Sequence, residues 1–344
     1  MNNPFYLFKG LGMRSYRVHE HGEPSSMKIE DIPELSPGHG QMLIDVQASG
    51  INFPDVLVIS GAYQLLPEKP FTPGKDFAGV VRAVGDGVTE YAAGDRIMSQ
   101  IEFGALAEQA LTTPSQSFRM PDGMSFEDAA AMGLVYQTAW FALMERSQYK
   151  AGETVLVGGA AGGVGLAAVQ IAIGHGATVL AAVRSEEEAE VVRASGAQHV
   201  INLSGGNLRE SIREQVHAAT GGRGADVVLD PLGAEFFAGA LRATAWCGRV
   251  VVIGFVAGDI PTLKVNYLLL KNISVSGLQW SDYRDRTPEK VRAAQDDLFR
   301  LWREGYVRPF VMRTFAFEEA ADAMALVRDG KVRGKVVVAV GSSR

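Results

Sequence analysis

The pattern of hydrophobic and polar positions changes along the chain and predicts two kinds of structure. From Tyr16 to about Leu111, short apolar stretches such as 42–46 and 79–84 are separated by turns rich in glycine and proline. This spacing is typical of short strands in a β-rich, partly closed sheet. The pattern changes near Ser125, where a serine, an aspartate three residues later and alanine-rich sequence predict the start of a helix.

From Glu153 onward, apolar strands alternate with helices. Continuous apolar runs predict strands at 154–157, 178–182, 199–201, 225–230, 249–254 and 273–277, and the sequence between them predicts helices at 166–173, 186–195, 208–220 and 236–245. Strands buried on both faces and joined by crossover helices form a parallel, doubly wound sheet. The predicted fold class is therefore α/β, with a Rossmann nucleotide domain and a β-rich, barrel-like catalytic domain.

The length of 344 residues favours two domains, because a chain of this size usually folds around more than one hydrophobic core. We place the nucleotide domain at 133–279 and the catalytic domain at 1–132 and 280–344. An amphipathic helix near 289–303 and a terminal strand at 335–340 then return the chain to the β-rich domain. We interpret the leucine triplet 268–270 as a short buried turn or strand.

A glycine-rich segment with the sequence VGGAAGGVG at 157–165 lies between a predicted strand and a predicted helix. It is a variant of the dinucleotide-binding fingerprint. Small residues let the backbone approach a pyrophosphate, and a helix beginning near Val164 directs its N–H groups and positive dipole end toward the phosphates. The alternative is a glycine-rich turn that binds no ligand.

The end of the second strand distinguishes the two nicotinamide cofactors. A site for NAD usually has an acidic residue there, whereas a site for NADP favours a cation near the 2′-phosphate. This chain has Arg184 followed by Ser185, which could add a hydroxyl donor, and so NADPH is expected. The alternative is an exposed arginine paired with Glu186 or Glu187.

Composition narrows the function classes. The formal net charge of -6 argues against a general nucleic-acid binder, and no apolar run approaches the ~20 residues of a membrane helix. The only cysteine, Cys247, can form neither an internal disulfide nor a multi-thiolate zinc site, which fits a reducing cytoplasm. Residues 1–9 lack a basic stretch followed by a long apolar one, so we expect a lead-in segment rather than a signal peptide.

Several ordered matches carry a resemblance to a known family. They lie at 49–55, 73–81, 94–96, 160–165, 270–275 and 334–337. On these residues the chain, from about Met13 to Val340, resembles the zinc-free quinone oxidoreductase (zeta-crystallin-like) branch of the medium-chain dehydrogenase/reductase superfamily.

The resemblance implies an NADPH-dependent oxidoreductase that transfers a hydride to a quinone or α,β-unsaturated carbonyl. Alcohol dehydrogenases of the superfamily hold zinc with cysteine and histidine, but the corresponding positions here look like Asn52 or its neighbours and 75–76, which read Lys-Asp. No zinc is therefore expected. An enoyl-thioester reductase and a cofactor-binding structural or regulatory protein with vestigial activity are the alternatives.

The resemblance also implies a cleft between the domains, bordered by Asn52, Asp55, Tyr63 and Thr138. Tyr63 is a candidate proton donor or oxyanion donor, or else it only walls the cleft. Asn52 is expected to orient the nicotinamide ribose. Asp55 is either a catalytic residue or a buried structural carboxylate.

Cofactor contacts implied by the resemblance are spread over both domains. They are Asn52, Thr138, Ala161, Gly162, Gly163, Val164, Arg184, Ser185, Gly254, Phe255, Leu278 and Lys335. The family often has a tyrosine after the third strand that contacts the adenine ring, but this chain reads Ile-Asn-Leu at 201–203. The last strand, 273–277, is expected at a sheet edge, and the family's habit and the exposed edge predict a two-fold homodimer.

Overall fold

The computed structural model describes residues 12–341 and divides into two compact units. Unit 1 contains Met1–Gly133, Arg313–Lys331 and Val336–Arg344, and unit 2 contains Leu134–Met312 and Val332–Lys335. The lead-in segment expected at 1–9 lies outside the described residues. No helix between residues 12 and 341 combines the length and hydrophobicity needed to cross a membrane.

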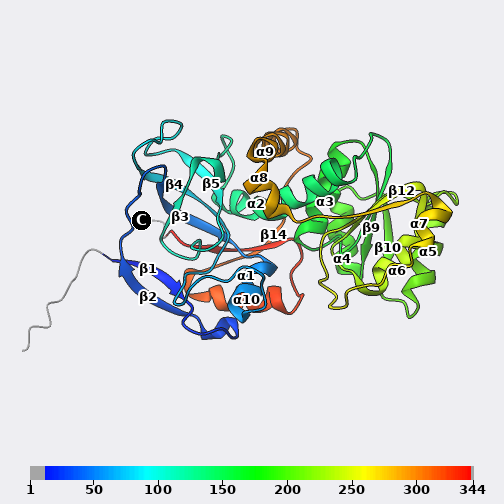
Figure 1. Cartoon of the computed structure of the whole chain (residues 1–344), viewed down its shortest axis with the longest axis horizontal. Helices are drawn as coiled ribbons and strands as arrows, with labels where there is room; N and C mark the ends of the chain where they lie inside the picture. The colour runs from blue at the N-terminus through cyan, green and yellow to red at the C-terminus, as the bar shows by residue number, and fades with distance from the viewer. Residues whose placement is uncertain (1–11, 342–344) are drawn as a thin grey trace, which may run out of the picture. The chain divides into compact units, whose positions relative to one another are not determined.

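Unit 1 is built on a seven-stranded sheet with β3 at its centre (Figure 1). The strands run in the order β14-β15-β3-β4-β5-β7, and β6 also pairs with β3. Their bounds are β3 Met42–Gly50, β4 Asp76–Val84, β5 Arg96–Gln100, β6 Gln109–Thr112, β7 Ser117–Arg119, β14 Val311–Phe315 and β15 Lys335–Ala339. A separate antiparallel pair is formed by β1 Gly12–Arg17 and β2 Lys28–Pro33. The structure thus confirms a β-rich domain.

Unit 1 also contains helices, of which the sequence analysis predicted only the one that starts after Ser125. α1 Phe53–Ser60 follows β3 directly, α10 Ala320–Arg328 precedes β15, and 3-10 turns occupy Pro24–Ser26, Pro114–Gln116 and Phe317–Glu319. α2 Phe126–Trp140 starts in unit 1, where the Asp128 backbone N–H donates to Ser125 Oγ at 3.0 Å. This contact confirms the predicted N-cap. A π-helical turn at Phe141–Arg146 continues α2 within unit 2.

Unit 2 holds a six-stranded sheet in which every neighbouring pair is parallel. Its order, β10-β9-β8-β11-β12-β13, is that of the dinucleotide-binding fold. The strands are β8 Thr154–Val157, β9 Thr178–Val183, β10 His199–Asn202, β11 Ala225–Asp230, β12 Thr244–Val252 and β13 Ser274–Gly277. The predicted α/β class is confirmed, and so is the edge position of the last strand.

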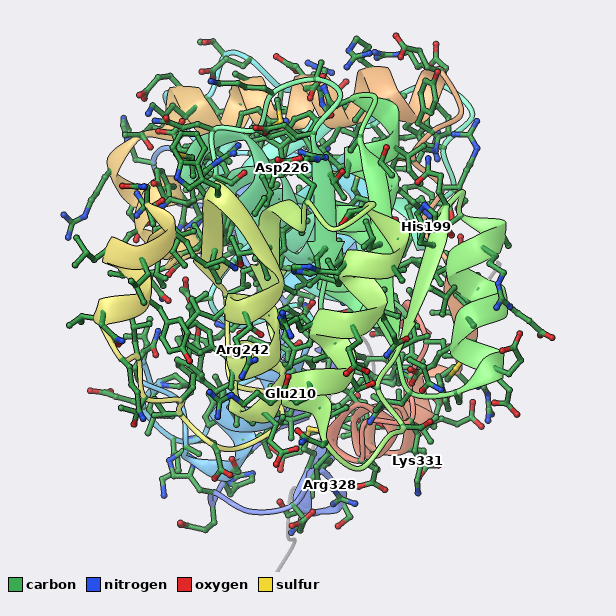
Figure 2. The ribbon with its side chains drawn as sticks, turned by 90° about the vertical axis from the view of Figure 1, so that its right-hand side faces the viewer. His199, Glu210, Asp226, Arg242, Arg328 and Lys331 are labelled. Atoms are coloured by element: carbon green, nitrogen blue, oxygen red, sulfur yellow. The ribbon has the colours of Figure 1, made fainter. Side chains whose placement is uncertain are left out.

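Helices accompany the strands of unit 2 (Figure 1). They are α3 Gly163–Gly174, α4 Glu186–Ala194, α5 Leu208–Ala219, α6 Ala234–Ala243, α7 Asn266–Lys271, α8 Trp280–Arg286 and α9 Pro288–Arg303. Leu156, Val228 and Ile212 belong to one buried apolar cluster that joins the sheet to α5 and α6. At the rim of this cluster, Arg242 of α6 pairs with Glu210 of α5 at 2.8 Å (Figure 2).

The segment 280–312 belongs to unit 2, whereas the prediction placed it in the catalytic domain. The reason is the apolar face of α9, which buries residues such as Leu298 and packs on α3. Asp297 of α9 also accepts hydrogen bonds from Trp140 Nε1 and His175 Nε2, each at 2.8 Å. Amphipathic periodicity showed that α9 would pack on a neighbour but not which one.

The leucine triplet was predicted wrongly, because it lies in α7 and its last two members are exposed. The exposed fractions are 79% for Leu269 and 70% for Leu270. Tyr267 and Leu268 pack against the core cluster, while Lys271 Nζ donates to the carbonyls of Arg242 and Thr244. These contacts turn one face of the short helix inward and leave Leu269 and Leu270 outside.

Candidate cofactor and acceptor sites

The glycine loop of unit 2 is shaped by close backbone contacts. A Cβ atom on Gly165 would lie 2.1 Å from the carbonyl oxygen of Gly159, and one on Gly158 would lie 2.6 Å from the ring of Phe236. Only glycine fits at these positions. The loop runs from β8 into α3, whose first residue is Gly163, and the first N–H groups of a helix have no intrahelical acceptor. This cradle therefore fits a pyrophosphate group.

The predicted loop residues lie at the start of α3. Gly162 is its N-cap, Gly163 and Val164 form its first turn, and Ala161 is buried directly before it. The carbonyl oxygen of Ala161 accepts the backbone N–H of Gly334 at 2.7 Å. The structure thus brings these four residues together at one helix terminus, and it adds the neighbouring segment Val332–Lys335 of the same unit.

Arg184 and Ser185 lie at the end of β9, directly before α4. Arg184 Nη2 donates to Glu188 Oε1 at 2.9 Å, and the Arg184 backbone N–H donates to the other oxygen of that carboxylate. Ser185 is the N-cap of α4, since its Oγ accepts the backbone N–H of Glu188. The ion pair foreseen as an alternative exists, but its partner is Glu188 rather than Glu186 or Glu187.

Asp230 ends the central strand β11 and holds the next turn. Its Oδ1 accepts the backbone N–H groups of Leu232 and Gly233, each at 2.8 Å. The side chain is fully buried, and this burial raises the pKa of Asp230 to about 6. The Asp230 carbonyl also accepts the N–H of Gly254 at 3.4 Å, so two strand ends are tied together.

The remaining predicted cofactor residues of unit 2 differ in exposure. Thr138, Leu278 and Lys335 are buried, with exposed fractions of 7%, 9% and 4%, whereas Phe255 is 41% exposed. Leu278 follows β13 and donates its backbone N–H to Val252 at the end of β12. In parallel sheets, ligands bind at these carboxyl ends of the strands.

In unit 1, Asn52 and Asp55 meet at the start of α1. The Asp55 carboxylate accepts the backbone N–H of Asn52 at 2.8 Å, which is the contact of a structural carboxylate at a helix start. The Asn52 side-chain amide donates to Asp76 Oδ2 at 2.9 Å. A Cβ atom on Gly133 would lie 2.4 Å from the Asp76 carboxylate, so a glycine is needed beside this buried network.

Lys75 is a buried cation in unit 1, with an exposed fraction of 3%. Its Nζ donates to Glu102 Oε2 at 2.8 Å and to the Glu102 carbonyl oxygen at 3.1 Å. The same ammonium lies 4.9 Å from the ring centre of Tyr63 and 5.2 Å from that of Phe103. Tyr63 is therefore fixed against a positive charge.

Comparisons with known proteins agree with this two-unit arrangement. The profile of the family described as zinc-binding dehydrogenase matches residues 163–296, and that of the alcohol dehydrogenase GroES-like domain matches residues 38–141. Quinone oxidoreductase-like protein 2 of Rattus norvegicus is 36% identical over 342 residues, covering 98% of this chain and 97% of the rat protein. This chain belongs to the quinone oxidoreductase family of medium-chain dehydrogenases/reductases.

Solved structures place the chain in the same family. A probable oxidoreductase from Mycobacterium abscessus is 36% identical with a TM-score of 0.85, covering 95% of this chain and 99% of that one. The Escherichia coli quinone oxidoreductase complexed with NADPH is 28% identical with a TM-score of 0.86 and the same coverage. The resemblance inferred from the sequence is thereby confirmed.

Some members of the superfamily use a catalytic zinc, but the donors present here do not fit one. The Lys75 ammonium has no lone pair to offer, and the Asn52 amide donates to Asp76. Residues 12–341 contain no group of three or more histidine, cysteine, aspartate or glutamate side chains that could hold a metal. We therefore derive no catalytic step through zinc in this quinone oxidoreductase family member.

The sequence analysis did not predict the contacts that three residues of these sites make. Glu188 was not considered although Ser185-x-x-Glu188 is a capping-box pattern. Lys75 was considered only as a poor zinc ligand, and Glu102 gave no indication, since it lies 27 positions from Lys75 in the chain. Contacts between distant segments leave no local pattern in a sequence.

Proposed function

We propose that the protein is an NADPH-dependent oxidoreductase that reduces a quinone or an α,β-unsaturated carbonyl without a metal. The observation that carries the proposal is the glycine cradle at the start of α3, with a cation, Arg184, at the end of the adjacent strand β9. NADPH supplies a hydride when it is bound. The NADPH complex of the Escherichia coli relative supports this choice of cofactor.

Energies favour a phosphate contact for Arg184 over its pairing with Glu188. The Arg184 side chain is 66% exposed, and an exposed ion pair of this kind contributes ~0.2–1 kcal/mol. A charge-assisted hydrogen bond to a phosphate contributes ~1.5–3 kcal/mol. We therefore expect the guanidinium to exchange Glu188 for the 2′-phosphate, while Ser185 donates its hydroxyl proton.

The chemistry assigned to unit 1 is proton supply and charge stabilisation. When a hydride adds to the carbon of an enone or quinone, an electron pair moves onto the acceptor oxygen. We assign Tyr63 as the hydroxyl group that donates a proton or a hydrogen bond to this oxygen. The Lys75 ammonium, 4.9 Å from the centre of the Tyr63 ring, favours negative charge near this hydroxyl group. Asn52 is assigned to the nicotinamide ribose.

The acceptor class is tested by following NADPH oxidation with quinones, enones and enoyl thioesters. Turnover of quinones or simple enones is expected. Turnover restricted to enoyl thioesters would replace the proposal by an enoyl-thioester reductase. Tight NADPH binding without turnover of any acceptor would favour a structural or regulatory protein.

The assignment of Tyr63 is tested by Tyr63→Phe, which keeps the ring against Lys75 and removes the hydroxyl. Loss of a general acid or oxyanion donor lowers kcat by roughly 100-fold or more. Tyr283→Phe, in unit 2, is the matched control and should leave kcat unchanged. A kcat within threefold of the original for Tyr63→Phe would show that the Tyr63 hydroxyl takes no part in catalysis.

Cofactor preference is tested by Arg184→Ala. The substitution should raise the dissociation constant for NADPH roughly ten- to a hundred-fold and leave that for NADH nearly unchanged, since only the phosphate contact is lost. Equal affinity of the unmodified protein for both cofactors would remove the NADPH assignment.

We also propose a cytoplasmic homodimer. Support for the dimer comes from β13 at the sheet edge and from Leu269 and Leu270, which are exposed on the preceding helix. The single cysteine is the observation that favours a reducing compartment. Sedimentation at micromolar concentration should give a dimer mass, and Leu270→Glu should shift the chain toward monomer.

A further inference from the structure

The segment Val332–Lys335 crosses beside the glycine loop and is fixed there by its backbone. The Gly334 N–H donates to the carbonyl oxygen of Ala161 at 2.7 Å, and the Lys335 N–H donates to that of Phe310 at 2.9 Å. Gly334 has a φ of +60°, and a Cβ atom on it would lie 2.2 Å from the Phe310 carbonyl oxygen. These contacts fix the backbone of the segment, and therefore the points from which the side chains of Arg333 and Lys335 extend.

The cations of this segment reach two different helix starts. Lys335 packs beside the start of α3, since its Cδ would lie 3.3 Å from a Cβ atom on Gly163. Arg333 reaches the first turn of α4 instead, where its Nη1 donates to Glu187 Oε2 at 2.8 Å. Lys335 is among the expected cofactor residues, but nothing in the sequence analysis pointed to Arg333.

Arg333 and Arg184 both pair with carboxylates in the first turn of α4. Their partners, Glu187 and Glu188, are consecutive residues in the first turn of α4, so their Cα atoms are about 3.8 Å apart. One guanidinium comes from the end of β9 and the other from the segment beside the glycine loop. Both guanidinium groups thus pair with the turn that follows the end of β9.

We propose that Arg333 is a second ligand of the adenosine 2′-phosphate and that Glu187 holds it in place until the cofactor binds. This inference rests on the proposed NADPH dependence. Glu187 is 75% exposed and can turn into solvent when a phosphate takes its place. The phosphate carries close to two negative charges, which matches two guanidinium groups better than one.

The alternative is that the Arg333–Glu187 pair only pins the segment to α4. The two roles differ in the effect of Glu187→Gln. If Glu187 competes with phosphate, its neutralisation frees Arg333 and strengthens phosphate binding. If the pair is a structural pin, the same substitution loosens the segment and leaves phosphate binding unchanged or weaker.

The experiment measures binding of 2′,5′-ADP and 5′-AMP by calorimetry, so no turnover is needed. Arg333→Ala should weaken 2′,5′-ADP roughly ten-fold and change 5′-AMP less than two-fold, whereas Glu187→Gln should tighten 2′,5′-ADP several-fold. Arg193→Ala is the matched control, because Arg193 pairs with Glu186 on the same helix and its removal changes the net charge equally. This control should keep the original ratio of the two constants.

The outcomes separate this inference from the proposed function. If the unmodified protein binds 2′,5′-ADP no better than 5′-AMP, the NADPH assignment itself fails. If it prefers 2′,5′-ADP and Arg333→Ala keeps that preference, Arg184 acts alone and the role of Arg333 is refuted. Arg333→Lys, which retains a charge, should recover part of the affinity, and circular dichroism of each variant checks that it is folded.

Discussion

The two units prepare their sites by different physical means. The glycine cradle of unit 2 consists of backbone, and Gly158, Gly163 and Gly165 lie within one short stretch of sequence. The network of unit 1 consists of side chains, and it joins Asn52 to Asp76 and Lys75 to Glu102. The backbone site requires residues without side-chain atoms. The side-chain site requires polar or charged partners from distant parts of the chain to meet after folding.

This difference predicts different consequences of substitution. Added atoms in the cradle should strongly weaken cofactor binding, because they meet neighbouring backbone and force the loop to change shape. Loss of either member of the Lys75–Glu102 pair should reduce stability and turnover and leave cofactor affinity unchanged. The following tests address this contrast in order of decreasing effect.

The largest effect is expected from Gly165→Ala. The new Cβ atom would lie 2.1 Å from the Gly159 carbonyl oxygen, so the loop has to open. NADPH affinity, measured by its fluorescence, should fall at least 100-fold, and overpacking should destabilise the protein by ~1–3 kcal/mol. Gly206→Ala is the control, because nothing lies within 4 Å of a Cβ atom there. Tight NADPH binding by Gly165→Ala would contradict the cradle.

Lys75→Met tests the side-chain site of unit 1. Removal of one member of a buried ion pair costs ~3–5 kcal/mol, with the lower end expected here because Glu102 is 24% exposed. Urea unfolding should show this loss, and kcat should fall while the NADPH dissociation constant stays within two-fold. The double variant Lys75→Met/Glu102→Gln should regain part of the stability, since no lone carboxylate remains. A changed NADPH affinity would break the proposed separation between the units.

Asp230 adds a side chain to the backbone site of unit 2, and its effect depends on pH. Burial raises the pKa of Asp230 from 3.8 to about 6, so the folded state binds its proton more tightly than the unfolded state. The contribution of Asp230 to the free energy of unfolding is fully present below about pH 4. It falls by roughly 2–3 kcal/mol as the pH rises through about 6. Thermal unfolding of Asp230→Asn should lack this decline. The same dependence of melting temperature on pH in both proteins would contradict this role of Asp230.

The smallest effect is expected from metal removal. Neither Lys75 nor the Asn52 amide suits zinc, so dialysis against a chelator should leave kcat unchanged. Metal analysis of the purified protein by mass spectrometry provides the control. Stoichiometric zinc together with chelator inactivation would contradict the metal-free chemistry.

The sequence by itself determined the α/β class, the parallel strands of unit 2, the glycine loop and Arg184 at the end of β9. These features depend on residues close together in the chain: the apolar run 225–230 is β11, and Ser125 caps α2 through its neighbour Asp128. Local periodicity and caps are decided by steric and hydrogen-bonding rules that act within a few residues.

Only the tertiary structure decided which partners these elements meet. The apolar face of α9 could have covered either unit, and contacts such as Trp140 to Asp297 join it to unit 2. The pairing of Lys75 with Glu102 and of Arg333 with Glu187 likewise spans 27 and 146 positions. An apolar face or a charged side chain can be stabilised by any complementary neighbour. Which neighbour it contacts therefore depends on the folded chain as a whole and not on the residues adjacent in sequence.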